Sequence, residues 1–426
     1  MSAVGELDVG ARRSCDARPP VRAGDPIDRF RFAEIRRELL LKHCKWDPQV
    51  DDVATLASFP LLMERRRWME LEFLAERLTR ELTDAEAELM ARDDLDRALA
   101  IPRGLRRVLR MARAGGATPA APRVMRFDFH WTASGWRISE VNADVPGGFS
   151  EASEFTRLLS EAVSGTAPPG HPGALWAGRI ALCSAGLPVA LLSAAGFMED
   201  LQVISYLAGT LGPLGVEARL ARPEQLEWKD GRAHIGGRPL GAIVRFYQAE
   251  WMARLPARSG WSRLFAGGTT PVSNPLRCVF GETKRFPLVW DRLHTSLPTW
   301  RKLLPETRDP REAPWRNGDS TDRWIIKTAW CNTGDTVSAP GLVGPREWRR
   351  ASWDASLRPR QWVAQRRFEA LPVTSPVDGR PLWPAVGVYT IDGRAAGAYC
   401  RISAGPVVNY RAMDAALLIT ETSDDC

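Results

Sequence analysis

Apolar side chains recur at helical spacing through the first quarter of the chain. They predict a helix over Asp28–Leu41 and a long amphipathic helix over Leu61–Leu82. The pattern continues as helix through Asp84–Ala98, with Thr83 as its N-cap, and a further helix is expected over Gly104–Arg113. This part of the chain is therefore predicted to be a helical framework.

The period then changes to two, which predicts a β-hairpin from the strands Val124–Trp131 and Trp136–Val141. The three-residue loop Ala133–Gly135, with its glycine in the left-handed conformation, suits such a hairpin. Alternation places Arg126, Asp128 and His130 of the first strand on one face. We expect Ile138, Glu140 and Asn142 of the return strand to share a common face as well.

This register puts Asp128 opposite Glu140 and Arg126 opposite Asn142. Two carboxylates directly opposite each other destabilise a strand pair, and a divalent cation between them would remove that penalty. Carboxylate and amide oxygens are the hard ligands that Mg²⁺ prefers. The alternative is a solvated hairpin face with an Arg–Asp ion pair, and the spacing alone leaves both interpretations open.

The middle of the chain alternates between helices and strands. A helix from about Ser150 to Ala162 is followed by predicted strands at Arg179–Cys183, Val216–Leu220 and Ala242–Phe246, with a helix at Met198–Leu211 between the first two. This order predicts a small parallel α/β unit. It is not a dinucleotide site, because no GxGxxG follows the first strand.

The last part of the chain is predicted to be mostly strand. Trp324–Lys327 and Trp362–Gln365 are short strands, while Ala385–Ile391 and Arg394–Ile402 form a hairpin across the turn pair Asp392-Gly393.

Two polar groups in these regions invite a functional interpretation. A lysine at a strand end followed by a polar loop, as at Lys327, can hold phosphates, although most lysines are merely solvated and no Walker A motif is present. Glu199-Asp200 opens a helix, where a capping role is favoured over a role in chemistry.

Composition narrows the functional classes. The chain has 426 residues, a net charge of +7 and seven scattered cysteines without a CxxC pair, which argues against a zinc site or a disulfide framework. No apolar run is long enough to span a bilayer and no secretory signal is visible, so a cytoplasmic protein without a membrane partner is expected. The positive charge fits an anionic substrate such as ATP. The chain has no dense basic run with interleaved aromatics, so nucleic-acid binding is not favoured.

The run RFDFHWTASGWRISEVNADVPGGFSEA, from Arg126 to Ala152, resembles the R-x-D and E-x-N-x-D signature of the glutathionylspermidine synthase family. The α/β unit from Arg179, the IIKTAW strand, the WVAQ strand and the hairpin GVYTIDGRAAGAYCRIS follow in the same order as in that family. The resemblance implies an ATP-grasp fold of the α/β (α+β) class over most of the chain from about residue 30.

By position, the resemblance assigns each candidate residue a role. Asp128, Glu140 and Asn142 match the family's Mg²⁺ ligands, and Arg126 matches the arginine that stabilises the transferring phosphoryl group. The nucleotide-binding set implied by the same comparison is Lys284, Lys327, Gly334 and Gln365.

The chain departs from the family pattern at three places on the nucleotide side. The loop after Lys327 contains only Gly334, Thr328 stands where proline is usual, and Arg360 or Gln361 replaces a second lysine. Arginine can hold a phosphate in a bidentate manner, so nucleotide binding does not require that lysine. An N-terminal cysteine–histidine amidase module is not seen, so we expect a synthetase alone.

The implied activity is ATP- and Mg²⁺-dependent ligation of a small-molecule or peptide carboxylate to an amine, through an acyl phosphate. The alternatives are an ATP-grasp phosphotransferase or a catalytically weak nucleotide-binding protein, and, more remotely, a nucleic-acid-binding protein. The sequence does not indicate the substrates or the oligomeric state. The expected division is a disordered tail (1–25), a helical part (26–115), the hairpin and helix of the ATP-grasp core (116–170), a preATP-grasp-like unit (171–280) and a nucleotide-binding part (281–426).

Overall fold

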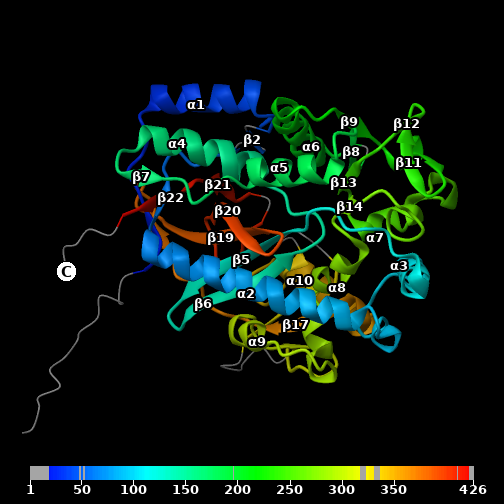
Figure 1. Cartoon of the computed structure of the whole chain (residues 1–426). Helices are drawn as coiled ribbons and strands as arrows, with labels where there is room; N and C mark the ends of the chain where they lie inside the picture. The colour runs from blue at the N-terminus through cyan, green and yellow to red at the C-terminus, as the bar shows by residue number, and fades with distance from the viewer. Residues whose placement is uncertain are drawn as a thin grey trace, which may run out of the picture.

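The structure is a computed structural model that describes residues 19–421, apart from 48, 51–52, 195, 317–322, 331–335 and 410. An antiparallel sheet lies at its centre (Figure 1). In spatial order its strands are β21 (Met413–Ala415), β20 (Arg394–Ser403), β19 (Pro381–Ile391), β5 (Val124–Thr132) and β6 (Gly135–Asn142), with β18 (Val373–Thr374) pairing β19.

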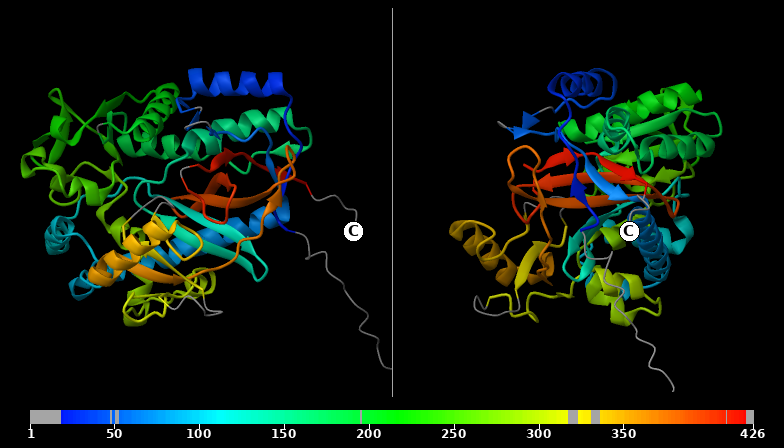
Figure 2. Two further views of the ribbon diagram at one scale, coloured as in Figure 1. Left: turned by 180° about the vertical axis from the view of Figure 1, so that it is seen from behind. Right: turned by 90° about the vertical axis from the view of Figure 1, so that its left-hand side faces the viewer.

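The two faces of this sheet are covered by different helices. The long helix α2 (Arg65–Leu89) packs on one face against β19 and β20, and its apolar stripe shares one buried core with Phe127 and Phe129 of β5. Helices α4 (Thr156–Ala162) and α5 (Pro172–Ser184) lie on the opposite side of the sheet from α2, and α1 (Arg29–Lys42) lies outside α4 (Figure 2). Apolar burial on both faces makes the sheet the rigid support of the molecule.

A parallel four-stranded sheet forms a separate α/β unit at one end of the molecule (Figure 1). Its order is β14 (Val272–Ser273), β13 (Ala242–Phe246), β8 (Val189–Ser193) and β9 (Ala218–Ala221), with α6 (Met198–Leu211) crossing between β8 and β9. The small sheet β10 (Glu227–Lys229), β11 (Arg232–Ile235) and β12 (Arg238–Pro239) extends this unit.

A third layer contains the two short strands predicted at Trp324–Lys327 and Trp362–Gln365. Strands β15 (Thr307–Arg308), β17 (Trp362–Arg366) and β16 (Trp324–Thr328) form an antiparallel sheet backed by α10 (Pro345–Leu357). The remaining elements are the sheet β1 (Arg22–Ala23), β4 (Leu61–Glu64), β22 (Leu417–Thr420) and β7 (Thr166–Ala167), the pair β2 (Gln49–Val50) and β3 (Val53–Ala54), and the helices α3 (Arg103–Met111), α7 (Ala249–Met252), α8 (Val279–Glu282) and α9 (Pro298–Leu303).

Most predicted elements are present at the expected places. The hairpin strands, the two nucleotide strands and the C-terminal hairpin are confirmed, and Asp28 caps α1 by accepting from the backbone N–H of Phe30 and Arg31. No helix of the described residues is both long and apolar enough to cross a membrane.

Three predictions about elements were wrong. Arg179–Cys183 is not a strand but the end of α5, since Trp176, Ala177 and Ile180 are buried at helical spacing; the first strand of the unit is β8. Residues 61–64 are strand β4, not the start of α2. Thr83 does not cap a new helix, because α2 runs unbroken to Leu89.

Candidate active site

The hairpin β5–β6 has the pairing that its sequence predicts. Asp128 lies opposite Glu140, and Arg126 lies opposite Asn142. The loop is one residue shorter than expected, because Thr132 pairs with Gly135, but a β-bulge between the two halves of the hairpin restores the register. The predicted contact pairs are therefore confirmed, although they arise from two deviations that cancel.

The bulge changes which residues share a face. The extra residue is Ser139, which has no partner in the ladder. Ile138 consequently pairs with Phe129 and is fully buried in the apolar core, so it does not share the polar face of Glu140 and Asn142 as predicted. The polar face of the hairpin therefore carries the charged residues and Asn142, without Ile138.

The facing carboxylates are neutralised by cations of the protein itself. Arg126 donates to both oxygens of Asp128, with Nε–Oδ1 at 2.8 Å and Nη2–Oδ2 at 3.1 Å, and the Nζ of Lys284 lies 3.0 Å from Oε2 of Glu140. Burial would raise the pKa of Glu140, but Lys284 and Lys327 outweigh it and hold that pKa below its usual value. Repulsion between the carboxylates therefore does not by itself require a metal ion.

The side-chain atoms available as metal ligands nevertheless suit Mg²⁺. Asn142 donates its amide nitrogen to Oδ2 of Asp128 at 3.1 Å, a contact that does not use its amide oxygen. With Glu140, these residues offer oxygen atoms alone, which is the chemistry that Mg²⁺ selects. Within the described ranges, the hairpin included, no group of three His, Cys, Asp or Glu side chains is arranged to hold a metal ion; the hairpin offers two carboxylates and one amide.

Lys327 of β16 reaches across to the hairpin. Its Nζ donates to the backbone carbonyl of Ser139 at 3.3 Å, so the bulge supplies the contact. Burial lowers the pKa of Lys327 to about 8, even though the carboxylate of Glu140 works against the shift. The neighbouring His130 contacts Ser139 Oγ at 3.1 Å, and burial lowers its pKa to about 4, so its ring is neutral at pH 7.

Gln365 is the last but one residue of β17 and lines a cavity together with Lys327. Its Nε2 donates to Oγ1 of Thr307 at 2.9 Å, whereas its buried Oε1 has no hydrogen-bond partner among the residues described. An unsatisfied acceptor beside Lys284 and Lys327 is the group that an amino-substituted base could meet. Gly334 lies outside the described residues.

Two small cavities meet at Glu140 and Lys327. One, of about 130 Å³, has Arg126, Asp128 and Tyr399 among its lining residues; the other, of about 30 Å³, is lined in part by Lys284 and Gln365. The two cavities bring together every predicted site residue that is described except Asn142, which joins through Asp128.

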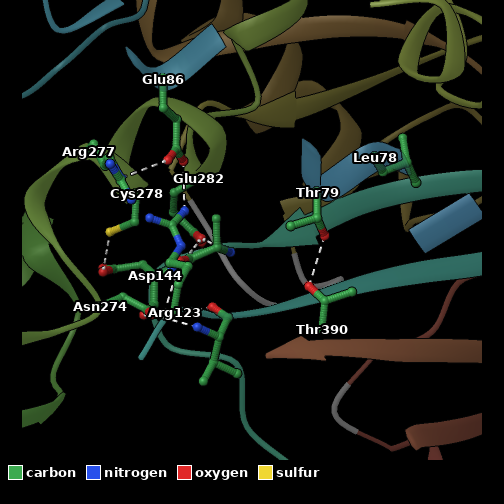
Figure 3. A network of polar contacts seen from close by, with 12 residues as sticks. Leu78, Thr79, Glu86, Arg123, Asp144, Asn274, Arg277, Cys278, Glu282 and Thr390 are labelled. Atoms are coloured by element: carbon green, nitrogen blue, oxygen red, sulfur yellow. Dashed lines mark hydrogen bonds and ion pairs between the residues drawn. The ribbon is translucent and has the colours of Figure 1, made fainter. Parts of the chain in front are cut away.

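A network of buried polar contacts, which no sequence pattern indicated, fixes the end of the hairpin. Asp144, which stands in the same acidic run, accepts from Arg245 of β13 and from the N–H of Ala249 at 2.7 Å. It also accepts from the Cys278 thiol at 2.9 Å (Figure 3). It is fully buried and anchors the hairpin to the α/β unit. Only the tertiary fold separates this role from that of Asp128.

Glu282 is a second group in this network that the sequence analysis did not assign to the site. One of its oxygens accepts from the N–H groups of Ala143 and Asp144, at 2.7 and 2.9 Å, and its side chain lines the cavity with Lys284. Burial and the charge of Asp144 raise the pKa of Glu282 to about 7. It positions the residues that follow Asn142. The only hint of this role in the sequence was that Glu282 stands two residues before Lys284.

Comparison with known proteins shows the family and the fold of the chain. The profile of the family described as glutathionylspermidine synthase, preATP-grasp, matches residues 61–419. The structure of a glutathione synthetase-like effector from Globodera pallida, in its apo form, is similar with a TM-score of 0.64 and 11% identity, over 92% of this chain and 96% of that one. This likeness shows the fold.

A weaker structural match is a candidate γ-glutamylcysteine synthetase from Methylobacillus flagellatus KT. Its TM-score is 0.42 and its identity 12%, over 75% of this chain and 83% of that one. No curated protein sequence matches the chain.

Proposed function

Because the chain belongs to the glutathionylspermidine synthase family, a family of ATP-grasp carboxylate–amine ligases, we propose that it joins a carboxylate to an amine at the expense of ATP. The observation that carries the proposal is the hairpin register, which gathers Arg126, Asp128, Glu140 and Asn142 on one face beneath Lys327. Fold membership alone would not assign chemistry, and the charged face is what supports the proposed reaction.

The side chains of this face would act by position and charge. Arg126 would hold the oxygens of the carboxylate and the phosphoryl group as negative charge develops between them. Lys327 and Lys284 would bind the phosphates of ATP, and Gln365 would meet the adenine with its unpaired Oε1. Mg²⁺ held by Asp128, Glu140 and Asn142 would supply charge neutralisation at the phosphates. An amine then attacks the acyl phosphate and phosphate leaves.

The site requires an opening movement to admit the nucleotide. The two cavities, of about 130 and 30 Å³, fall below the ~300–1,000 Å³ of ordinary ligand pockets. The sheet of β16 and β17 contacts the hairpin through the Lys327–Ser139 hydrogen bond and few other groups, so it is the layer that we expect to move. Sheet movement would carry Lys327 and Gln365 with the nucleotide.

The test is ADP release with Mg²⁺, ATP and a panel of amino acids, peptides and polyamines, with products identified by mass spectrometry. Asp128→Ala and Glu140→Ala are expected to lower turnover by at least about 100-fold, because each removes an oxygen ligand and strands the cation beside it. Glu227→Ala, which removes an exposed carboxylate from β10, is the matched control and should keep full activity.

Each outcome has a distinct meaning. An amide product supports the ligase. A stable phosphorylated product would identify a phosphotransferase, and binding of ATP without turnover would identify a nucleotide-binding protein. Wild-type activity in either alanine variant would contradict the metal assignment.

A further inference from the structure

A large cleft lined by arginine lies outside the candidate active site. It has a volume of about 940 Å³, and five arginines line it: Arg97, Arg103, Arg106, Arg110 and Arg360. We call these five residues and the space between them the arginine cleft. Three of its members come from α3, Arg97 follows the short helix Asp93–Leu95, and Arg360 precedes β17.

The sequence of α3 explains how the arginines gather. Leu105, Val108 and Leu109 are buried against the core, which turns the opposite stripe of the helix outward. Arg103, Arg106 and Arg110 stand three, then four residues apart, so they lie one above another on that stripe. Like charges at this spacing destabilise a helix, so without a bound anion the three arginines lower the stability of α3.

None of the five guanidinium groups has a hydrogen bond or ion pair with another described residue. Nε of Arg106 is even buried without a partner. An adjoining cleft of about 850 Å³, which shares Arg97 and Arg360, provides an internal comparison. There the arginines are ion-paired: Arg285 and Arg311 with Asp309, Arg292 with Asp94, Arg301 with Asp291 and Arg308 with Glu306.

The carboxylates near the arginine cleft are engaged elsewhere. Asp96 accepts from Arg113 at 2.7 and 2.8 Å, and Asp94 accepts from Arg92 and Arg292, at 2.9 and 2.8 Å. Asp93 alone remains in the lining to oppose five guanidinium groups. The cleft therefore holds an uncompensated positive charge in a concave space.

We propose that the arginine cleft binds a small polyanion that carries at least two phosphate or carboxylate groups. Guanidinium groups bind such oxygens in pairs, and several of them on one concave wall match a ligand with several anionic groups. The volume is that of a small-molecule site. Single-stranded nucleic acid is disfavoured because no aromatic side chain lines the cleft for bases to stack on.

This site is distinct from the one that would bind ATP. Arg360 and Gln361, one of which stands where the resemblance implies a second nucleotide lysine, line the arginine cleft and do not line the cavities at Lys327. The two sites are joined through the backbone: Ala329 N donates to the carbonyl of Gln361 at 2.7 Å, and Lys284 N donates to that of Ala329 at 3.0 Å. The proposal stands whether or not the chain is a ligase.

The test is calorimetric titration of the full chain with inorganic tripolyphosphate and, separately, with citrate. The chain carries Lys327→Met throughout, so that phosphate binding at the candidate active site does not contribute. We expect one saturable site, weakened about tenfold or more by Arg103→Gln or Arg106→Gln and weakened further by added salt. The stronger of the two probes identifies phosphoryl or carboxylate groups as the preferred anion.

Arg107→Gln is the matched control, because it removes the same charge from an exposed position of the same helix that does not line the cleft. It should leave binding unchanged. Exposed Arg103 allows its variant to fold, which thermal unfolding verifies. Absence of binding, or an equal loss in Arg107→Gln, would overturn the proposal. So would a single-stranded oligonucleotide that binds these arginines more tightly than either probe.

Discussion

At the residue scale, positive charges outnumber negative ones around the candidate active site. Arg126, Lys284 and Lys327 face the carboxylates of Asp128 and Glu140, and Arg367 and Arg401 line the same cavity. His130 contributes no charge at pH 7, since burial lowers its pKa to about 4. The surplus of positive charge suits the phosphates of a nucleotide better than a metal ion alone.

Asp200 is a carboxylate whose ionisation should weaken the fold. It lies in the first turn of α6, yet it makes no capping hydrogen bond, contrary to the role its position indicated. Its side chain is buried, and Oδ2 finds no partner within the described part of the chain. Burial, with a smaller effect of Glu199, raises the pKa of Asp200 to about 7.

This raised pKa predicts a pH-dependent stability. Between pH 4 and 7 the unfolded chain loses the Asp200 proton while the folded chain keeps it, so the free energy of unfolding falls as pH rises, and it levels off above pH 7. Asp200→Asn should therefore match the wild type near pH 4 and exceed it by about 2 kcal/mol at pH 8. Urea unfolding at both pH values measures this difference.

Glu199→Gln, at the exposed neighbouring position, is the control and should change the pH profile far less. An Asp200→Asn variant that is equally stable at both pH values relative to wild type would refute the assigned pKa.

At the element scale, the hairpins were predictable because local chemistry determines them. The C-terminal hairpin turns at Asp392 and Gly393, and both have positive φ, as a two-residue turn of this kind requires. The bulge at Ser139 was not predictable, because alternation of apolar and polar residues assumes an unbroken ladder. The end of α5 was mistaken for a strand for a different reason: a short apolar run fits both the period of a strand and that of a helix.

Deletion of Ser139 tests what the bulge contributes. The deletion joins Ile138 to Glu140, which yields a regular hairpin with Asp128 still opposite Glu140. It removes the carbonyl that accepts from Lys327 and the hydroxyl beside His130. We expect a folded protein whose affinity for ATP falls about tenfold, measured by calorimetry, because Lys327 loses its positioning contact.

Ser139→Ala is the companion variant, since it keeps the carbonyl and removes only the hydroxyl. It should bind ATP like the wild type. Unchanged ATP affinity in the deletion variant would show that the bulge does not position Lys327.

At the scale of the whole molecule, the candidate site joins segments that sequence proximity does not connect. Lys284 and Lys327 meet the hairpin from well over a hundred residues away, and nothing local specifies Glu140 or Ser139 as their partners. Their roles came from the resemblance to the family, while the fold supplied their contacts. The division at residues 26–115, 116–170, 171–280 and 281–426 stays a prediction; β22, near the end of the described chain, pairs in parallel with β4 near its start.

The Asp144–Arg245 ion pair is a buried connection between the end of the hairpin and the α/β unit, and both side chains are almost fully buried. Arg245 also donates to the carbonyls of Tyr247 and Asn274, at 2.6 and 3.0 Å, so one guanidinium ties three segments together. Arg245→Met leaves Asp144 as an uncompensated buried charge. The free energy of unfolding should fall by about 3–5 kcal/mol, measured by urea denaturation.

The double variant Asp144→Asn with Arg245→Met separates the charge from the packing. Asparagine keeps an acceptor for the N–H of Ala249 but carries no charge, so the double variant should recover at least half of the stability lost by Arg245→Met. Equal losses in the two variants would show that the contacts of the guanidinium with the backbone, and not the ion pair, hold the α/β unit against the hairpin. If the ion pair has the predicted role, the double variant should also regain the ATP affinity that the single variant loses, because the end of the hairpin carries Asn142 and Glu140 into the candidate site.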